Sequence, residues 1–306
     1  MVYTPKLCRT MASKPRAVES RHRAVGFRVR AVAPSYAELH VLTRFAPAPT
    51  GYLHLGHVVN ALRVWGAARD RGGQVLLRIE DHDRQRSRAE FEQAILEDLA
   101  WLGFTHDGNM VRQSERESIY RAEVQRLIDR GLVYGCRCTR SEIASGTRNR
   151  EPGTAEPRYA STCRGKGIPL SDDVGWRVIM EPGVERFDDE ILGPQEQDPS
   201  EQCGDLLVRD RRGNWTYQFA VTVDDHLQQI TDVIRGEDLL ASTGRQIRLA
   251  RLLGRNTPPR FWHHGLIMKS PTQKLSKSDG DTGVRDLRAS GWTREQVLEK
   301  AANLLG

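Results

Sequence analysis

The chain has 306 residues, of which 38% are hydrophobic and 28% are charged. This size and composition fit an enzyme with one main domain and a small insertion, and they provide enough chain for a core. No stretch approaches the ~20 apolar residues that span a bilayer, and the start lacks the apolar run of a secretory signal. We therefore expect a cytoplasmic protein rather than a membrane or secreted one.

The net charge of +6 is concentrated at the N-terminus. Residues 1–40 contain eight Lys or Arg residues and two Glu residues, so the remainder of the chain is formally neutral. Any RNA-binding surface of the folded part must then be a local patch. Residues 1–40 lack hydrophobic periodicity and are predicted to be a disordered extension. An over-long start and an organelle transit peptide, which is also Arg-rich and acid-poor, are alternative interpretations.

The first predicted elements form a β-loop-α-β unit. Residues 41–45 read as a strand, and residues 47–56 are a loop rich in Pro and Gly. Residues 57–71 keep apolar side chains at helical spacing until two glycines stop the pattern, and residues 74–79 form the next strand.

Two further helices are predicted from their ends. The sequences beginning at Ser87 and Ser114 have the form of capping boxes, and the helices end near Gly103 and Gly131. Gly131 marks the approximate edge of the first half of a nucleotide-binding domain, residues 41–135.

Residues 136–205 change character, with four cysteines and an acidic, aperiodic loop over 185–205, and we predict an insertion. The β/α alternation then resumes, which predicts a second half-domain at 206–306 and an α/β, Rossmann-like core split by the insertion. The expected elements are a hairpin of 206–208 with 215–223, strands at 230–234 and 261–268, and helices at 242–253 and 293–305.

The sequence HLGH at residues 54–57 lies between the first predicted strand and the helix that follows it. Backbone N–H groups at a helix start bind anions, and Gly56 allows a nucleotide to approach the backbone closely. His54 and His57 can donate hydrogen bonds to ATP phosphates. The simpler interpretation is that they are ordinary loop histidines.

The sequence KLSKS at residues 274–278 supplies a second candidate motif. Lys274 and Lys277 can neutralise charge that develops on phosphates when a carboxylate displaces pyrophosphate. Alone, this segment could equally be a solvated basic turn. Both motifs in this order, separated by most of a domain, favour ATP chemistry.

The paired motifs resemble the ATP-handling signatures of class I aminoacyl-tRNA synthetases. The surrounding segments narrow the resemblance to the glutamyl-tRNA synthetase group, and it runs from about residue 42 to the second motif. Those segments are RFAPAPTG at 44–51, RIED at 78–81, YQFA at 217–220 and VIRGEDLL at 233–240.

The resemblance implies a set of site residues. The implied catalytic residues are His54, His57, Lys274 and Lys277, and the implied ATP-binding residues are His54, Gly56, His57 and Lys277. The implied glutamate-binding residues are Arg44, Ala46, Glu80, Tyr217 and Arg235. Arg44 and Tyr217 would hold the side-chain carboxylate, Arg235 the α-carboxylate and Glu80 the ammonium. Taken singly, an arginine is more often part of a surface ion pair.

Only residues 279–306 follow the second motif, which is too short for the helical anticodon-binding region of a full glutamyl-tRNA synthetase. The chain is most similar to the branch of the group that activates glutamate with Mg²⁺-ATP and transfers it to queuosine at the wobble position of tRNA(Asp). We expect a monomer without an anticodon-binding domain. The alternatives are a shortened synthetase that charges a tRNA 3′ end and a non-catalytic RNA-binding paralogue.

The cysteines point to reduced thiols or a metal, because nothing indicates export. Cys136, Cys138 and Cys163 offer three soft ligands within the predicted insertion, although this spacing alone leaves zinc and free thiols open. The resemblance supplies Tyr159 as a fourth ligand and implies one structural zinc ion per chain. Cys8 and Cys203 are interpreted as bystanders.

Overall fold

The computed structural model describes residues 40–145, 157–266, 268–270, 273–274 and 283–305. The predicted extension at 1–40 therefore lies outside the described residues, except for His40. Among the described helices, none combines the length and apolarity needed to cross a bilayer.

A parallel sheet of three strands opens the fold, in the order β1 (Leu42–Phe45), β2 (Gln74–Ile79) and β3 (Val111–Arg112). Helix α1 (Leu55–Asp70) connects β1 to β2, and α2 (Ala89–Leu102) connects β2 to β3. The predicted β-loop-α-β unit is confirmed, with β2 at the predicted bounds.

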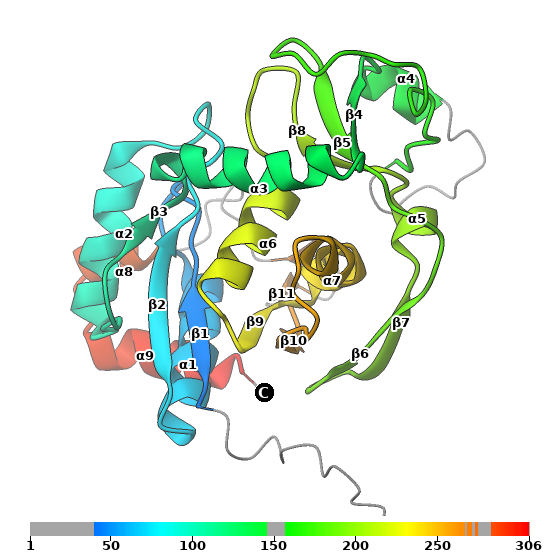
Figure 1. Ribbon diagram of the computed structural model, residues 1–306. Helices are drawn as coiled ribbons and strands as arrows, with labels where there is room; N and C mark the ends of the chain where they lie inside the picture. The colour runs from blue at the N-terminus through cyan, green and yellow to red at the C-terminus, as the bar shows by residue number, and fades with distance from the viewer. Residues whose placement is uncertain (1–39, 146–156, 267, 271–272, 275–282, 306) are drawn as a thin grey trace, which may run out of the picture. The chain divides into compact units, whose positions relative to one another are not determined.

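A second sheet has the order β7-β6-β10-β9. Its strands β6 (Glu185–Asp189), β10 (Arg260–His264) and β9 (Asp232–Gly236) are parallel, and β7 (Gly193–Gln197) is antiparallel to β6. Thr231 N–H, just before β9, donates to the carbonyl of Leu42 at 2.8 Å. β1 and β9 consequently lie side by side, and the two sheets continue one another (Figure 1).

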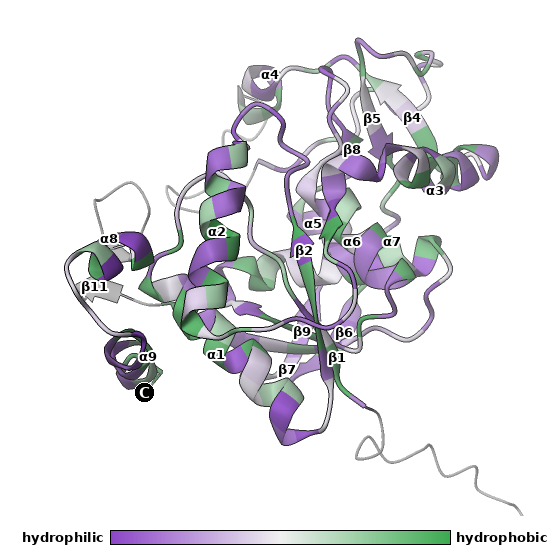
Figure 2. Cartoon of the chain, turned by 90° about the vertical axis from the view of Figure 1, so that its left-hand side faces the viewer, coloured by the Kyte–Doolittle hydropathy of each residue, from purple (hydrophilic) through white to green (hydrophobic). Residues whose placement is uncertain are grey.

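Helices cover both faces of these strands. α1, α2, α8 (Val284–Ala289) and α9 (Arg294–Asn303) gather on one side, and α6 (Tyr217–Leu227) and α7 (Thr243–Leu252) on the other (Figures 1 and 2). The first group buries a core against β1 and β2 that includes Phe45, Val59 and Leu77. Figure 2 shows apolar residues on these central strands and polar residues on the outer turns of helices such as α9.

A third, antiparallel sheet lies apart from the parallel strands in Figure 1. It has the order β4 (Val133–Cys136), β5 (Gly175–Val178) and β8 (Leu206–Arg209). Its core is shared with α3 (Glu117–Asp129) and α6, where Trp215 stacks on Phe219 with ring centroids 5.1 Å apart. The remaining elements are α4 (Arg140–Ser145), α5 (Pro199–Gln202), β11 (Met268–Ser270) and β12 (Gln273–Lys274).

The two predicted capping boxes did not form. The N-caps of α2 and α3 are Arg88 and Arg116, and neither side chain caps its helix. The Ser114 hydroxyl instead donates to Asp81 at 2.5 Å, because the loop after β2 offers a carboxylate there. Gly103 does end α2 in the left-handed conformation, with φ of 80°.

The segment 185–205 is not the predicted irregular loop. It contains β6, β7 and α5, and β6 alternates buried and exposed residues before it pairs with β10 of the parallel sheet. The acidic residues Glu185, Asp188 and Asp189 hid this strand. The predicted half-domain boundaries themselves stay a prediction.

The predicted hairpin of 206–208 with 215–223 is also wrong, because most of its second strand is helix α6. Arg209 and Trp215 form an isolated antiparallel bridge, and the chain then enters α6. Residues 215–223 are rich in aromatic and β-branched side chains, which favour strands locally. Burial of Phe219 and Val223 against α3 and β8 outweighs that preference.

Candidate active site

The first motif caps α1. His54 is the N-cap, its Nδ1 accepts from Gly56 N–H at 3.1 Å, and the backbone N–H of His54 donates to His57 Nδ1 at 3.1 Å. The two rings lie against each other with centroids 3.9 Å apart. A Cβ on Gly56 would lie 2.9 Å from the His54 ring, so only glycine fits this arrangement. The helix start thus presents two imidazoles and the positive end of its dipole.

The described chain that follows the second motif contacts the first motif. β12 ends at Lys274, and Gly283 forms an antiparallel bridge with His54, while Val284 N–H donates to Leu53 at 2.9 Å. The described chain at Gly283 thus lies against the start of α1. Lys277 itself lies outside the described residues, and of Lys274 only the backbone is described.

Arg44 and Arg78 meet at a buried carboxylate. Arg44 extends from β1 and donates to Asp225 at 3.0 Å, and Arg78 from β2 donates to the same oxygen at 2.8 Å. Arg78 also reaches Glu80 at 3.2 Å and Gln228 at 2.8 Å. Burial opposes the charge on Asp225, but the two arginines hold its pKa below the ordinary value. Burial raises the pKa of Glu80, with Arg78 acting against that shift.

Asp224 organises the neighbouring contacts and is fully buried. It accepts from Gln113 at 2.8 Å, Tyr120 at 2.9 Å and Arg116 at 2.7 Å. Because the amide nitrogen of Gln113 faces Asp224, its oxygen accepts from His82 Nδ1 at 2.7 Å. Nε2 of His82 is then the unprotonated nitrogen of the neutral ring.

Arg235 is held by a second group of contacts. Its Nε donates to His263 at 3.0 Å, and its two terminal nitrogens donate to Gln246 at 2.8 Å and Thr243 at 2.9 Å. His263 in turn lies 2.6 Å from Asp189. Burial, together with the charge of Arg235, lowers the pKa of His263 to about 4, so this ring is neutral near pH 7.

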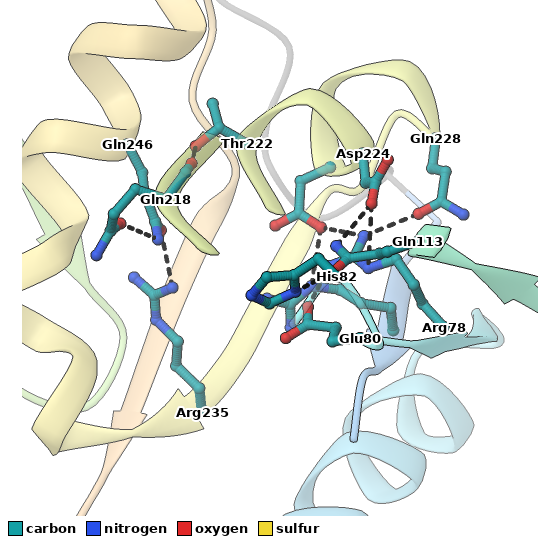
Figure 3. Close-up of polar contacts among 12 residues, drawn as sticks. Arg78, Glu80, His82, Gln113, Gln218, Thr222, Asp224, Gln228, Arg235 and Gln246 are labelled. Atoms are coloured by element: carbon teal, nitrogen blue, oxygen red, sulfur yellow. Dashed lines mark hydrogen bonds and ion pairs between the residues drawn. The ribbon is translucent and has the colours of Figure 1, made fainter. Parts of the chain in front are cut away.

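The two groups face each other across helix α6 (Figure 3). Gln218 and Thr222 lie on the face of α6 toward Arg235, whereas Asp224 and Gln228 lie on the face toward Arg78. Each pair is four residues apart, so one helix positions both groups.

Tyr217 is the first residue of helix α6. Charged residues of both groups, around Arg78 and around Arg235, influence the pKa of its hydroxyl. Burial raises its pKa, Arg235 and Arg44 act against that shift, and Glu80 acts with it. Ala46 follows β1 directly and is half-buried. Arg44, Glu80 and Arg235 thus all lie close enough to Tyr217 to influence its hydroxyl.

The cysteine cluster lies near the antiparallel sheet. The sulfur atoms of Cys136, Cys138 and Cys163 lie within 4.8 Å of one another, and those of Cys138 and Cys163 are 3.6 Å apart. Two sulfur ligands of a tetrahedral zinc ion, each at about 2.3 Å, are about 3.8 Å apart, so this spacing fits zinc. Tyr159 lies beside the cluster, since its hydroxyl is 3.3 Å from the sulfur of Cys136 and its side chain is buried. Cys203 is not one of these three cysteines: its thiol donates to the carbonyl of Pro199, and its own carbonyl accepts from Tyr159 N–H at 3.0 Å.

A model of the catalytic domain of class I tRNA synthetases (E and Q) matches residues 40–305. The chain belongs to this family. The synthetase is accordingly a ligase with an α/β catalytic domain. It is 44% identical over 273 residues to a glutamyl-Q tRNA(Asp) synthetase of Bordetella bronchiseptica. That match covers 88% of this chain and 82% of the relative. A protein of the same name from Geobacter sulfurreducens is 41% identical, with 84% and 83% covered.

Proteins named glutamate--tRNA ligase are also similar to this synthetase. Glutamate--tRNA ligase 2 of Halorhodospira halophila is 39% identical over 86% of this chain and 57% of the relative. A solved glutamate tRNA ligase from Elizabethkingia meningosepticum, in complex with its amino acid, has a TM-score of 0.67 and 31% identity. That match covers 79% of this chain and 53% of the solved one, so the synthetase spans about half the length of these ligases.

Sequence reasoning missed the residues that hold the expected ligand contacts, namely Asp189, Gln113, Asp224, Asp225, Gln246 and His263. A paired acid at 224–225 was the one visible signal, and it directly follows the segment 215–223 that was predicted to be a strand. Asp189 and His263 join β6 to β10, and that pairing required β6 to be recognised.

Proposed function

We propose that this synthetase activates L-glutamate with Mg²⁺-ATP without tRNA and transfers it to queuosine at the wobble position of tRNA(Asp). The observation that carries the first step is the group formed by Arg44, Glu80, Tyr217 and Arg235, all placed beside the strand ends at which open α/β sheets bind ligands. Identity of 41–44% to proteins named glutamyl-Q tRNA(Asp) synthetase supports the second step.

Glutamate offers two carboxylates and one ammonium group. Arg44 and Tyr217 would bind the side-chain carboxylate, Arg235 the α-carboxylate and Glu80 the ammonium, with Ala46 among the contacts. Partners fixed by buried hydrogen bonds keep each arginine in position before the ligand arrives, which reduces the entropy cost of binding.

Activation joins the glutamate α-carboxylate to ATP. A carboxylate oxygen forms a bond with the α-phosphorus, the bond to the bridging oxygen breaks, and pyrophosphate leaves with that electron pair. His54, Gly56 and His57 would bind the phosphates at the start of α1. Lys274 and Lys277 would neutralise the charge that develops on the leaving group, and the Mg²⁺ brought with ATP would share that task.

Transfer then forms an ester. A hydroxyl oxygen of the queuosine ring bonds to the glutamyl carbonyl carbon, the bond from that carbon to the AMP oxygen breaks, and AMP leaves. The hydroxyl proton passes to solvent. Holding the hydroxyl against the adenylate would supply much of the rate acceleration.

We further propose one structural zinc ion held by Cys136, Cys138, Tyr159 and Cys163. The close spacing of the three sulfurs and the phenol supports this ligand set. The ion would tie the end of β4 to residues 159–163 and take no part in the reaction.

The acceptor is tested with labelled glutamate, ATP and tRNA(Asp) from cells that make queuosine and from cells that cannot. After transfer, the 3′ end is removed with a nuclease, because periodate would also cleave the queuosine diol. Label that needs queuosine and stays on the trimmed tRNA supports the proposal. Label that is lost with the 3′ end would instead indicate a shortened glutamyl-tRNA synthetase that charges the tRNA 3′ end.

A further inference from the structure

A cavity of about 400 Å³ lies beside the candidate active site. Its walls come from the loop after β2, the turn before α3, and the loop between β8 and α6. Arg84, Arg121, Arg209 and Arg212 line it, and we name it the arginine cavity. It lies within the size range of small-molecule sites in proteins.

The arginine cavity shares a wall with the glutamate-binding group. His82 lines the cavity, and its ring lies 6.3 Å from that of Tyr217. Gln113 also lines the cavity and connects His82 to Asp224 through its two amide ends. A ligand in the cavity would therefore end next to the proposed glutamate site.

Charge in the cavity is only partly compensated. Arg121 pairs with Glu117 at 2.8 Å, and Arg209, which is 4% exposed on its side chain, pairs with Asp172 at 2.7 Å. Arg212 instead donates to the side-chain oxygen of Gln85 at 2.7 Å.

Arg84, like Arg212, donates to an uncharged oxygen, since it lies 3.5 Å from the carbonyl oxygen of Ser114. These two exposed arginines thus contact neutral oxygens and keep a local positive field at the rim. Because residues 41–306 are formally neutral, this is a local patch of the kind that a phosphate-binding surface in this chain requires.

We infer that the arginine cavity binds the RNA nucleotide that carries the acceptor hydroxyl, with the adjoining phosphates at Arg84 and Arg212. This inference rests on the proposed function. An unpaired anticodon-loop nucleotide can be splayed from its stack and inserted as a unit, which suits a cavity better than a duplex end. Its backbone phosphates would stay at the rim, where arginine forms bidentate contacts.

The test compares two double variants that lose the same charge. Arg84→Gln/Arg212→Gln changes the rim, and Arg69→Gln/Arg186→Gln changes exposed arginines that do not line the cavity. Glutamate-dependent ATP–pyrophosphate exchange without tRNA should stay within twofold of the unchanged protein in both, which also shows that both fold.

Binding of unacylated tRNA(Asp) should then separate the variants. The rim variant should bind at least tenfold more weakly, and the slope of log affinity against log salt should fall by about 1.4, at about 0.7 for each lost single-strand phosphate contact. An anticodon stem-loop should compete for this binding, and an acceptor-stem helix should not. Equal affinity and slope in the two variants, a raised KM for ATP in the rim variant, or competition by the acceptor stem would overturn the inference.

These binding measurements do not depend on where glutamate is attached. If the proposed acceptor is wrong, the queuosine requirement fails in the unchanged protein while the rim variant still reports on the cavity. If the cavity inference is wrong, transfer to queuosine persists in the rim variant with the tRNA affinity of the control.

Discussion

His263 and Asp189 form a buried pair in which Nδ1 of the ring lies 2.6 Å from a carboxylate oxygen, and both side chains are fully buried. Because the carboxylate accepts from Nδ1–H, the lone pair of the neutral ring is on Nε2, which accepts from Arg235 at 3.0 Å. A residue of β6 thereby sets the orientation of an arginine on β9.

We expect Asp189→Asn to weaken glutamate binding. An amide can donate to Nδ1, which would move the proton of the His263 ring to Nε2. The Nε2–H group of His263 and the Nε–H group of Arg235 would then both be donors and could not form a hydrogen bond. A mismatch of this kind costs about 1–3 kcal/mol, so the KM for glutamate in pyrophosphate exchange should rise on the order of tenfold, with kcat and the KM for ATP changing less. Asp188→Asn, at the exposed neighbouring position, is the control. A rise in the KM for ATP equal to that for glutamate would contradict a positioning role.

Stability should fall on acidification because of His263. Burial lowers its pKa from 6.5 to about 4, with Arg235 and His264 acting in the same direction and Asp189 acting against them. Between these two values the unfolded chain binds the proton and the folded chain does not, so stabilisation present above pH 6.5 is lost as pH falls to 4. The loss amounts to roughly 3 kcal/mol.

Urea unfolding of the unchanged protein and of His263→Gln from pH 7 to pH 4 checks this contribution. The variant, which cannot titrate at this position, should lose less stability over the same range. Parallel curves for the two proteins would show that His263 does not contribute. Comparing the two curves removes the effect of the other titrating groups.

Purified protein should carry close to one zinc ion. Cys136→Ser or Cys138→Ser should lose it and destabilise the region around β4 and residues 159–163, because the binding energy of the ion contributes to folding. Cys203→Ser, a buried cysteine outside the cluster, should keep the metal. Elemental analysis of protein purified without chelators gives the ratio, and a substoichiometric value would count against the site.

Lys277→Ala should reduce the rate of glutamate activation at least a hundredfold with little change in the KM for ATP. Its charge is needed most while pyrophosphate leaves, and removing one such transition-state contact costs about 3 kcal/mol. Lys300→Ala, at an exposed position on α9, should behave like the unchanged protein. An equal effect on rate and ATP binding would show that Lys277 serves binding alone.

The predictable part of the fold is the part in which local pattern and packing agree. α1 keeps apolar residues on one face, and Gly103, which adopts a positive φ that glycine tolerates, marked the end of α2. The helix α6 was not, since its local preference is for a strand and only the packing of Phe219 and Val223 reverses it.

The missed helix also concerns two of the missed site residues, Asp224 and Asp225, which directly follow the predicted strand. If that strand continued, they would point to opposite faces, and no single arginine could reach both. In a helix they are about 100° apart, so Arg78 lies 2.8 Å from one and 3.9 Å from the other. Arg44, Glu80, Tyr217 and Arg235 were identified through the family resemblance, and their supporting partners lie too far along the chain for local patterns to show.

The ionic groups of the site have a consequence for substrate choice. Arg235 is buried, and its donor nitrogens contact the neutral acceptors His263, Gln246 and Thr243 rather than a carboxylate. A substrate carboxylate at this arginine would pair the buried charge, whereas a ligand in which that carboxylate is esterified or missing would leave it unpaired. Leaving such a charge unpaired costs several kcal/mol, so Arg235 selects for a free carboxylate at this end of the substrate.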